Sequence, residues 1–409
     1  MKPPSLFSGN PLIEALGPIQ TESEIRDRMA RTPPLPTPEE VSRRELAMHR
    51  LNSLKELNVV TVDALKIGLT VSIAVREGYR YRHPADPKTT ALIRGRPLAG
   101  DLPETPMVSI VSVSGMGKSR AISRALASQF EQIIEHPTYP GVVGTFDQLV
   151  YLKVDVPGTG KLIDLARALM IETDRVLGTE EFNEMLSLRK PAPMAMFNAW
   201  LRVARRQSLG MLALDEINNL FKPEPRKVRL AKVGRAAAPV LRLVEEETLR
   251  CMLTIANTWR IPLVFLSTPE GMEAMSSRFA VAQRMCLDGH HHIRFPHSAE
   301  DANTLGLYLP ALQNYQYLPK PLKIGPAEAG ELFELTGFVP RILFAAWRLG
   351  QRVALEAGSR SFTMDHIRLA MQTYLAPLQA PIAALQSNDP MRMRRYQDLL
   401  PPEGFWNGL

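Results

Sequence analysis

The sequence predicts an α/β fold in which helices flank a parallel sheet of five strands, and three apolar runs carry this prediction. The runs at residues 107–113, 211–214 and 261–267 are short and rich in apolar side chains. Strands buried on both faces of a parallel sheet read as continuous apolar segments of this length. Longer stretches separate the runs, so each strand can return to one sheet through a helix.

The first run leads into a glycine turn and then into a helix. Residues 107–121 read M-V-S-I-V-S-V-S-G-M-G-K-S-R-A. Backbone N–H groups around Gly115 and Gly117 can converge on phosphate oxygens, and a helix that opens at Lys118 directs its positive end there. Lys118 would contact the β- and γ-phosphates, while the Ser119 hydroxyl would bind Mg²⁺. Ser112 departs from the G-x-x-x-x-G-K-[ST] pattern because it replaces the leading glycine.

This stretch predicts a P-loop that binds ATP and Mg²⁺. The alternative is a chance G-K-S sequence at a strand-to-helix corner. The expected nucleotide contacts are Ser114, Gly115, Met116, Gly117, Lys118, Ser119 and Arg120.

A second element of a nucleotide site lies downstream, where the run at 211–214 ends in Asp215 and Glu216. Ligands of parallel sheets collect at the carboxyl ends of the strands, where Asp215 would hold Mg²⁺ through water. Glu216 is then placed to orient and deprotonate the attacking water. The alternative is an ordinary strand end with a helix-capping acid.

Two polar residues further along the chain complete the predicted site. Thr268 follows the strand at 261–267 and can sense the γ-phosphate, with Ser267 as the neighbouring alternative. Arg341 opens a later helix of a predicted C-terminal lid, from which it can reach back to the nucleotide. The alternative is an arginine that only contacts solvent. Such an arginine would be electrostatically unfavourable at this position, because the helix dipole disfavours a cation at the N-terminus. The apolar stripe of this helix comprises Leu343, Trp347, Gly350 and Ala354.

The order of P-loop, acidic strand, polar sensor strand and helical lid resembles the AAA+ ATPases. Within that superfamily the chain is most similar to transposition regulators of the TnsC/TniB type, the ATPases of transposons with a heteromeric transposase. Origin-recognition and initiator ATPases share several of the same features. The resemblance covers residues 95–375 and rests on S-G-M-G-K-S at 114–119, L-A-L-D-E-I-N-N-L at 212–220, the helix-strand unit at 248–271 and S-R-F at 277–279, with weaker support from A-V-R-E-G-Y-R-Y-R-H-P at 74–84.

The resemblance implies an ATPase that works as an oligomer. The S-R-F segment looks like the end of the helix that carries the arginine finger, so Arg278 would complete a neighbouring subunit's site. Arg284 is the second candidate, and a surface salt-bridge partner is the alternative for either.

The implied assembly is a ring or helical filament on double-stranded DNA, bound without sequence preference. Transposase subunits and a target-selection protein are the implied partners, and hydrolysis would trigger disassembly. Two alternatives remain, namely an initiator or helicase-loader ATPase and a nucleotide-gated DNA scaffold with little turnover.

Basic residues offer two candidate contacts to DNA. The net charge is +7 over 409 residues, so local clusters matter more than the sum. The densest cluster follows the acidic strand and can lay cations along a phosphate backbone, although it can also be a solvated loop. The resemblance adds Thr159, Lys161 and Arg167, after a strand expected at 149–156. The candidates in the dense cluster are Arg226, Lys227, Arg229, Lys232 and Arg235.

Composition excludes several classes of protein. No apolar run approaches the ~20 residues that cross a bilayer, and M-K-P-P-S lacks the apolar core of a signal peptide, so we expect a cytoplasmic bacterial protein without membrane contact. Cys251 and Cys286 have no C-x-x-C spacing, which indicates neither a disulfide framework nor a zinc site. The adjacent histidines at 290–292 do not converge on one ion, and the D-G before them indicates a loop.

The expected organisation has five parts. Residues 1–40 are rich in proline and read as an extended arm, and residues 41–95 form a helical segment. The AAA+ core spans 96–298 and the lid 299–375. Residues 376–409 combine basic and aromatic side chains, which is typical of a partner-docking tail but also compatible with packing on their own domain. The helical segment carries two apolar stripes, Leu46, Leu51, Leu54 and Leu57, then Ile67, Val71 and Val75.

Overall fold

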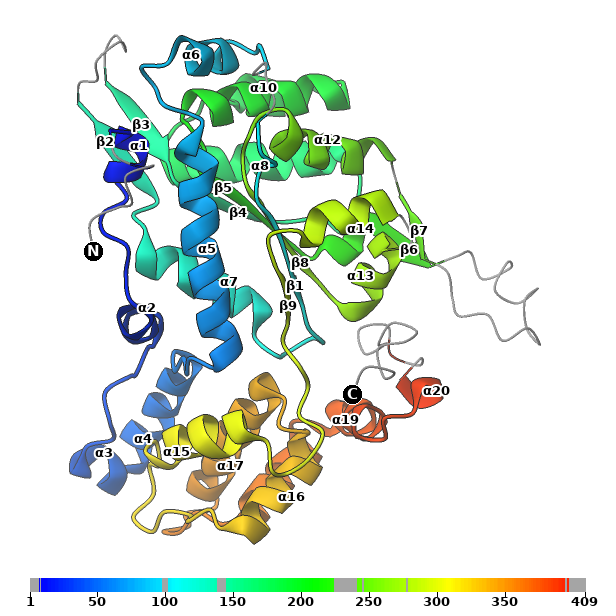
Figure 1. Cartoon of the computed structure of the whole chain (residues 1–409). Helices are drawn as coiled ribbons and strands as arrows, with labels where there is room; N and C mark the ends of the chain where they lie inside the picture. Colours follow the sequence, from blue (N-terminus) through cyan, green and yellow to red (C-terminus); the bar gives the residue numbers. More distant parts are fainter. Residues whose placement is uncertain are drawn as a thin grey trace, which may run out of the picture. The chain divides into compact units, whose positions relative to one another are not determined.

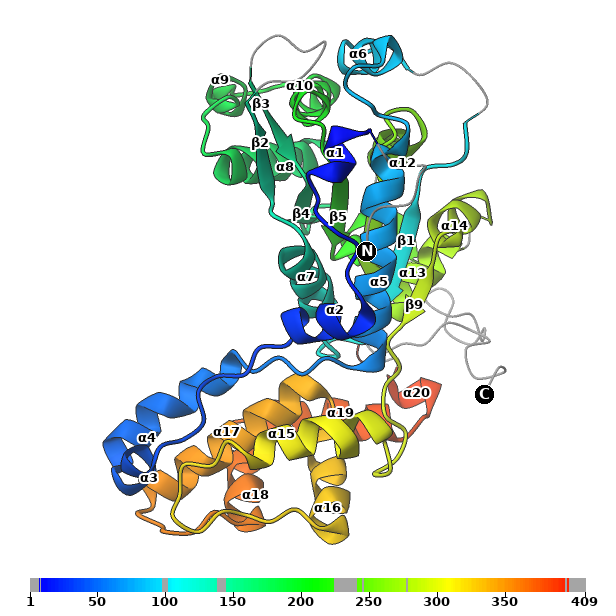
Figure 2. The same cartoon turned by 60° about the vertical axis from the view of Figure 1, so that its left-hand side comes forward.

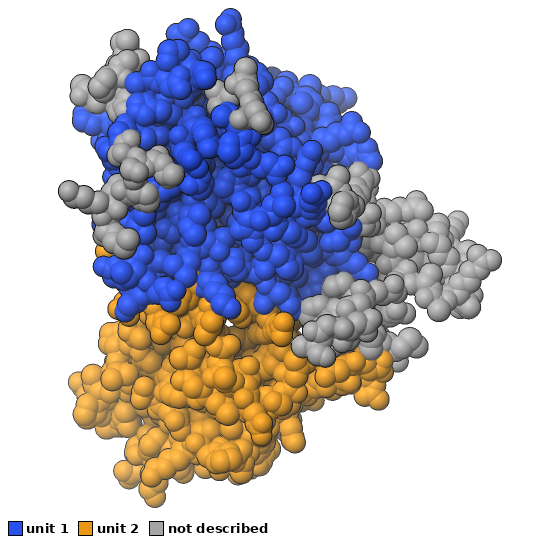
Figure 3. All heavy atoms as spheres, viewed as in Figure 1, with its two compact units in different colours: residues 1–25, 66–111, 122–292 blue, residues 26–65, 112–121, 293–409 orange. Residues whose placement is uncertain are grey.

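The computed structural model divides into two compact units, which are coloured separately in Figure 3. Unit 1 comprises residues 1–25, 66–111 and 122–292, and unit 2 comprises residues 26–65, 112–121 and 293–409. The structure describes residues 7, 9–97, 102–137, 145–223, 241–244, 246–276, 279–393 and 396.

Unit 1 is built on a five-stranded parallel sheet with the strand order β4-β5-β8-β1-β9 (Figure 1). The predicted α/β fold with a five-stranded parallel sheet is therefore confirmed. Strand β8 lies between β1, which leads into the P-loop, and β5, which ends at Asp215 of the acidic pair. The strands of this sheet are β1 Met107–Val111, β4 Tyr151–Asp155, β5 Met211–Asp215, β8 Leu263–Ser267 and β9 His290–His292.

The three central strands are buried along their whole length, as their continuous apolar runs predict. Leu212 and Phe265 point into a core that they share with apolar side chains of α8 (Leu162–Leu177), α10 (Pro193–Arg206) and α12 (Glu246–Asn257). Helix α5 (Val62–Arg80) packs against the residues that lead into β5 and β8. A Cβ atom built on Gly78 of α5 would lie 2.3 Å from Pro262 Cγ, so only glycine permits this approach.

Further short strands form two antiparallel pairs. Helices α8 and α10 of unit 1 lie side by side (Figure 1). The paired strands are β2 Ile133–His136 with β3 Phe146–Leu149, and β6 Phe221–Pro223 with β7 Leu241–Leu243. The helices wholly within unit 1 are α1 Pro11–Glu14, α6 Pro87–Ile93, α8 Leu162–Leu177, α9 Asn183–Ser187, α10 Pro193–Arg206, α12 Glu246–Asn257, α13 Pro269–Ser276 and α14 Phe279–Cys286, with the 3-10 helix η3 Ile217–Leu220. Residues of α2 Glu22–Met29, α5 Val62–Arg80 and α7 Lys118–Gln129 belong to both units.

Unit 2 is helical, and α16, α17 and α18 lie side by side in it (Figures 1 and 2). The apolar stripe predicted for α17 is buried, and Gly350 allows α18 to come close, because a Cβ there would lie 2.9 Å from Ile367 Cγ1. Its helices are α3 Pro38–Ser42, α4 Arg44–Arg50, α15 Leu309–Gln313, α16 Pro326–Thr336, α17 Pro340–Glu356, α18 Met364–Thr373, α19 Gln379–Gln386 and α20 Pro390–Met393, with the short turns η2 Leu51–Lys55, η4 Thr304–Tyr308 and η5 Ala376–Leu378.

The N-terminal region differs from the extended arm expected at residues 1–40. Helix α1 forms because Asn10 caps it and Pro11 fits its first turn, and Leu12 and Ile13 are buried. The Asn10 side chain also donates a hydrogen bond to the carbonyl of Tyr79 at 2.9 Å. The burial of Leu12 and Ile13 in unit 1 therefore outweighs the tendency of this proline-rich segment to stay extended.

The helical segment expected at 41–95 divides between two cores. Leu51, Leu54 and Leu57 are buried in the core of unit 2, which also contains Trp347 and other residues of α17. The second stripe, Ile67, Val71 and Val75, is fully buried on α5 within unit 1. The helical pattern is interrupted between the two stripes, and at this interruption the chain passes from the core of unit 2 to the core of unit 1.

The loop expected at the three histidines is instead strand β9, and that prediction was wrong. The turn before it exists, since Gly289 has φ +146° and Asp288 accepts a hydrogen bond from the Met107 N–H at 3.0 Å. The chain beyond the turn then pairs in parallel with β1. None of the described helices is both long and apolar enough to span a membrane.

Candidate nucleotide-binding site

The P-loop backbone has the shape that a phosphate cradle needs. Gly115 and Gly117 have φ angles of +89° and +96°, in the left-handed region that favours glycine. Helix α7 begins directly after them at Lys118, so the backbone N–H groups of its first turn face the glycine turn. The side chain of Lys118 is buried, with 6% of its surface exposed. These residues therefore fit the phosphate groups of a nucleotide.

Ser112 shows why the leading glycine of the P-loop pattern is dispensable in this chain. Its backbone is not among the positive-φ positions, so a side chain costs no strain there. The residue is fully buried, and its hydroxyl donates to the Val113 carbonyl at 3.1 Å. A small polar side chain with this local partner fits where the pattern has glycine.

Arg341 lies beside the P-loop. Its backbone N–H donates to the Gly115 carbonyl at 3.3 Å. A Cβ atom on Gly115 would lie 3.5 Å from Arg341 Cβ and only 2.8 Å from Val339 Cγ1. Because Val339 provides no side-chain cap for α17, the P-loop carbonyl meets one of the free N–H groups at the start of that helix. The Arg341 side chain is exposed, so it is available to a phosphate.

The other residues predicted to contact nucleotide differ in their environment. Arg120 is exposed, but its guanidinium donates to the Lys55 carbonyl at 2.8 Å. Ser114 is exposed, Met116 is buried and Ser119 is half-buried. The structure therefore places Ser119 at the start of α7, and gives Arg120 a protein partner that the sequence does not reveal.

The acidic pair and the sensor residue lie at one edge of the sheet. Val111 pairs with Ser267 across β1 and β8, and Leu214 pairs with Phe265 across β5 and β8. All three strands run in the same direction, so the P-loop, Asp215 and Thr268 follow strands that end at this edge. This is the carboxyl edge, where ligands of parallel sheets bind.

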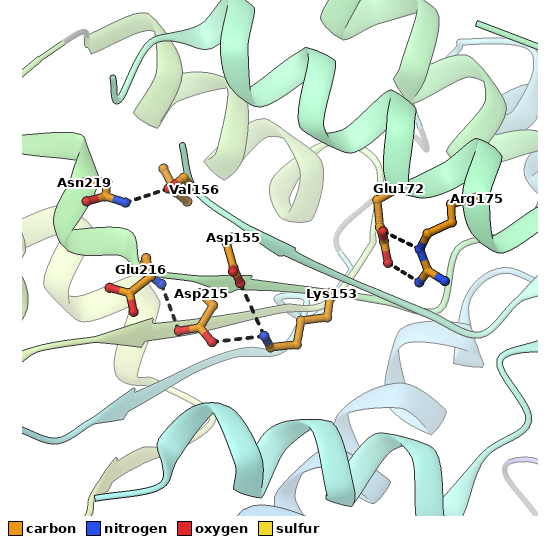
Figure 4. A network of polar contacts seen from close by, with 8 residues as sticks. All are labelled: Lys153, Asp155, Val156, Glu172, Arg175, Asp215, Glu216 and Asn219. Atoms are coloured by element: carbon orange, nitrogen blue, oxygen red, sulfur yellow. Dashed lines mark hydrogen bonds and ion pairs between the residues drawn. The ribbon is translucent and has the colours of Figure 1, made fainter. Parts of the chain in front are cut away.

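Asp215 is held by two donors (Figure 4). The residue as a whole is 2% exposed, and its Oδ1 accepts a hydrogen bond from the Glu216 N–H at 2.9 Å. Its Oδ2 lies 3.1 Å from the Nζ of Lys153 on β4, which is also 3.3 Å from Asp155 Oδ1. Burial alone would lower the pKa of Lys153, but the charges of Asp215 and Asp155 outweigh it and raise this pKa.

Lys153 is a residue of this site that no sequence motif reveals. The only signal is a lysine between Leu152 and Val154 in Y-L-K-V-D, since both apolar neighbours are buried in the core. Its partner Asp215 lies on the neighbouring strand, so the pair becomes evident only once the register of β4 against β5 is known.

Glu216 has an unusual backbone for a residue with a side chain. Its φ of +55° and ψ of +40° are left-handed, a conformation that costs a non-glycine residue roughly 1–2 kcal/mol. Such strain is concentrated at functional positions. The half-buried side chain follows β5 directly and precedes η3.

The hydroxyl groups of Ser267 and Thr268 both have local partners. Thr268 Oγ1 accepts from the Gly271 N–H at 3.3 Å and so supports the start of α13, while retaining a proton to donate. Ser267 Oγ donates to the Thr268 carbonyl at 2.9 Å. Since Ser267 has used its only proton, Thr268 is the better donor toward a phosphate.

The candidates for DNA contact lie partly outside the described residues. Thr159 is exposed and donates to Asp164 at 2.6 Å, and the exposed Lys161 precedes α8. Arg167 is half-buried, and its Nε has no hydrogen-bond partner among the residues that the structure describes. The basic cluster of Arg226, Lys227, Arg229, Lys232 and Arg235 lies outside the described residues, as does Arg278, whereas Arg284 is exposed on α14.

Asn219 ties the loop after β4 to the turn after the acidic pair. Its Nδ2 donates to the Val156 carbonyl at 2.7 Å. Gly160 lies so close that a Cβ there would be 2.4 Å from the Asn219 carbonyl oxygen. The loop that carries Thr159 and Lys161 is therefore fixed against η3.

Comparisons with known proteins find similarity of fold only. No protein-family model and no curated protein matches the chain. The solved ORC2 protein of Aeropyrum pernix in its ADPNP–ADP complexes is 14% identical, with a TM-score of 0.38 over 74% of this chain and 66% of that one. The ADP form of that protein is 13% identical, with a TM-score of 0.39 over 66% of this chain and 63% of that one. Drosophila ORC bound to DNA is 12% identical, with a TM-score of 0.37 over 96% of this chain and 84% of that one.

The chain thus spans at most 66% of either Aeropyrum chain. All three likenesses are distant. The α/β fold with its five-stranded parallel sheet therefore rests on the strand order, and the phosphate cradle rests on the backbone of the glycine turn.

Proposed function

We propose that the protein is a Mg²⁺-dependent AAA+ ATPase that assembles on double-stranded DNA and links target-site choice to transposase recruitment. The observation that carries the nucleotide part is the left-handed Gly115–Gly117 turn, which begins α7 and has Arg341 beside it. The carboxyl edge of the sheet adds the acidic pair of Asp215 and Glu216.

Each residue has a distinct part in the proposed reaction. Lys118 and the N–H groups at the start of α7 bind the β- and γ-phosphates, and Ser119 and Asp215 would hold Mg²⁺, which supplies charge neutralisation when bound. Glu216 accepts the proton of the attacking water. Thr268 and Arg341 contact the γ-phosphate, and Arg278 acts on the site of a neighbouring subunit.

The DNA part of the proposal rests on the motif resemblance and on charge. Lys161 is exposed on the loop after β4, and Asn219 connects that loop to the turn after Glu216. A cation near a phosphate backbone could therefore influence the hydrolytic site through this loop. Contacts of this kind bind DNA without reading its sequence.

An initiator or helicase-loader ATPase is the second candidate. The solved structures with similar folds include Drosophila ORC bound to DNA, although that likeness is distant. A nucleotide-gated scaffold with little turnover is the third candidate. Glu216 favours hydrolysis over a scaffold, because its carboxylate can act as the general base.

Steady-state phosphate release, measured with and without random duplex DNA, tests the proposal. We expect Mg²⁺-dependent turnover that DNA stimulates, with no preference among duplex sequences. A strong preference for one origin-like sequence would favour the initiator, and tight ATP binding without turnover would favour the scaffold. Retention of a co-expressed transposase on the DNA-bound protein tests the transposition role.

A further inference from the structure

We propose that Lys153 is a positioning residue that competes with Mg²⁺ for Asp215 and so sets the magnesium requirement of the site. The inference rests on the proposed nucleotide-binding function. Lys153 lies on β4, the strand next to the one that carries Asp215. It belongs neither to the P-loop nor to the acidic pair, and it acts through Asp215 alone.

Both carboxylate oxygens of Asp215 already have partners within the protein. One carboxylate oxygen accepts the Glu216 N–H at 2.9 Å, and the other lies 3.1 Å from the Lys153 ammonium group. The side chain of Asp215 is only 3% exposed, so water screens this ion pair weakly. A divalent cation that approaches Asp215 must therefore overcome the repulsion of a lysine already bound there.

Asp155 offers Lys153 a second carboxylate partner. Its Oδ1 is already 3.3 Å from the Lys153 Nζ (Figure 4). The Asp155 side chain is 71% exposed. A half-buried ammonium group that lost its only carboxylate would pay a desolvation cost. Lys153 can instead leave Asp215 and keep its ion pair with Asp155. The ammonium group thus has two positions, one shared between both carboxylates and one at Asp155 alone.

This role differs from that of a purely structural ion pair. If Lys153 only stabilised the buried carboxylate, its loss would disorder Asp215 and weaken metal binding. If Lys153 competes with the metal, its loss strengthens metal binding. The two roles thus predict opposite signs for the same substitution.

The test measures metal binding directly, by electron paramagnetic resonance of Mn²⁺ added to the full-length protein with a non-hydrolysable ATP analogue. Lys153→Met keeps the apolar stem and removes the charge. We expect it to bind Mn²⁺ about tenfold more tightly than the wild type, which corresponds to about 1.4 kcal/mol. Lys88→Met removes an exposed lysine on α6 in the same unit and should change nothing.

Asp155→Asn tests the same exchange from the other side. It removes the second partner of Lys153 at an exposed position, so Mn²⁺ binding should weaken several-fold while the fold is kept. This variant decides the question if Lys153→Met does not fold. Unchanged or weaker Mn²⁺ binding in a folded Lys153→Met, or unchanged binding in Asp155→Asn, would overturn the proposal.

The wild-type titration separates this inference from the proposed function. Failure of the wild type to bind the analogue at all would reject the nucleotide site itself. Normal binding of analogue and Mn²⁺ by the wild type, without the opposite shifts in the two variants, would reject only the role of Lys153.

Discussion

The P-loop and the acidic edge of the sheet serve the same predicted ligand but are built in different ways. The P-loop depends on its backbone, through two left-handed glycines and the start of α7. The acidic edge depends on charged side chains from neighbouring strands, with Lys153 and Asp155 of β4 around Asp215 of β5. A backbone site is specified by short local sequence, whereas a side-chain site is specified by strand register.

This contrast also explains what could be predicted from the sequence. The five-stranded sheet follows from its apolar runs, and the P-loop follows from glycine spacing, since both signals are local. The Lys153–Asp215 pair joins residues far apart in the chain, so no local pattern indicates it. The same holds for the contact of Arg341 with Gly115, and for β9, whose histidines become a strand only because β1 offers an edge.

The largest expected effect is on catalysis at the acidic edge. Glu216→Gln should slow ATP turnover by about 100- to 1,000-fold and leave nucleotide binding intact, because the amide cannot accept the proton of water. Phosphate release and binding of a fluorescent ATP analogue measure the two properties. Glu172→Gln is the matched control, since Glu172 pairs with Arg175 on α8, away from Asp215 (Figure 4). Unchanged turnover in Glu216→Gln would remove Glu216 from the mechanism.

The next effect tests the backbone character of the P-loop. Gly115→Ala should weaken nucleotide binding by at least about tenfold, because it adds a left-handed alanine and a Cβ 2.8 Å from Val339 Cγ1. Gly117→Ala should cost less, since its Cβ would meet nothing within 4 Å. Gly306→Ala lies in η4, has open space and should be neutral. Equal losses at Gly115 and Gly117 would show that close packing at Gly115 does not matter.

A third experiment chooses between the two hydroxyl groups at the end of β8. Thr268→Val should lower turnover by about tenfold and reduce stability by about 1 kcal/mol, because the hydroxyl also supports the start of α13. Ser267→Ala should have the smaller effect on turnover. Phosphate release and thermal melting measure both variants, and a larger turnover loss in Ser267→Ala would exchange their roles.

The smallest expected effect is at Arg341. Arg341→Ala should weaken ATP binding about fivefold, because the exposed side chain contributes roughly 1 kcal/mol to a charged partner. ADP binding should change less, since the partner is the γ-phosphate. Arg352→Ala removes an arginine of the same helix that pairs with Glu356 at 2.7 Å, and it should leave both affinities unchanged. Equal losses for ATP and ADP would argue against γ-phosphate contact.

The most direct test of nucleotide-driven assembly is electron microscopy of the full-length protein with duplex DNA of random sequence. Samples with ATP, with a non-hydrolysable analogue and without nucleotide should be compared, with Lys118→Ala as the variant that lacks the phosphate-binding lysine. We predict rings or helical filaments only where both nucleotide and DNA are present, and none with Lys118→Ala. A monomer that ignores DNA in every sample would contradict the proposed function.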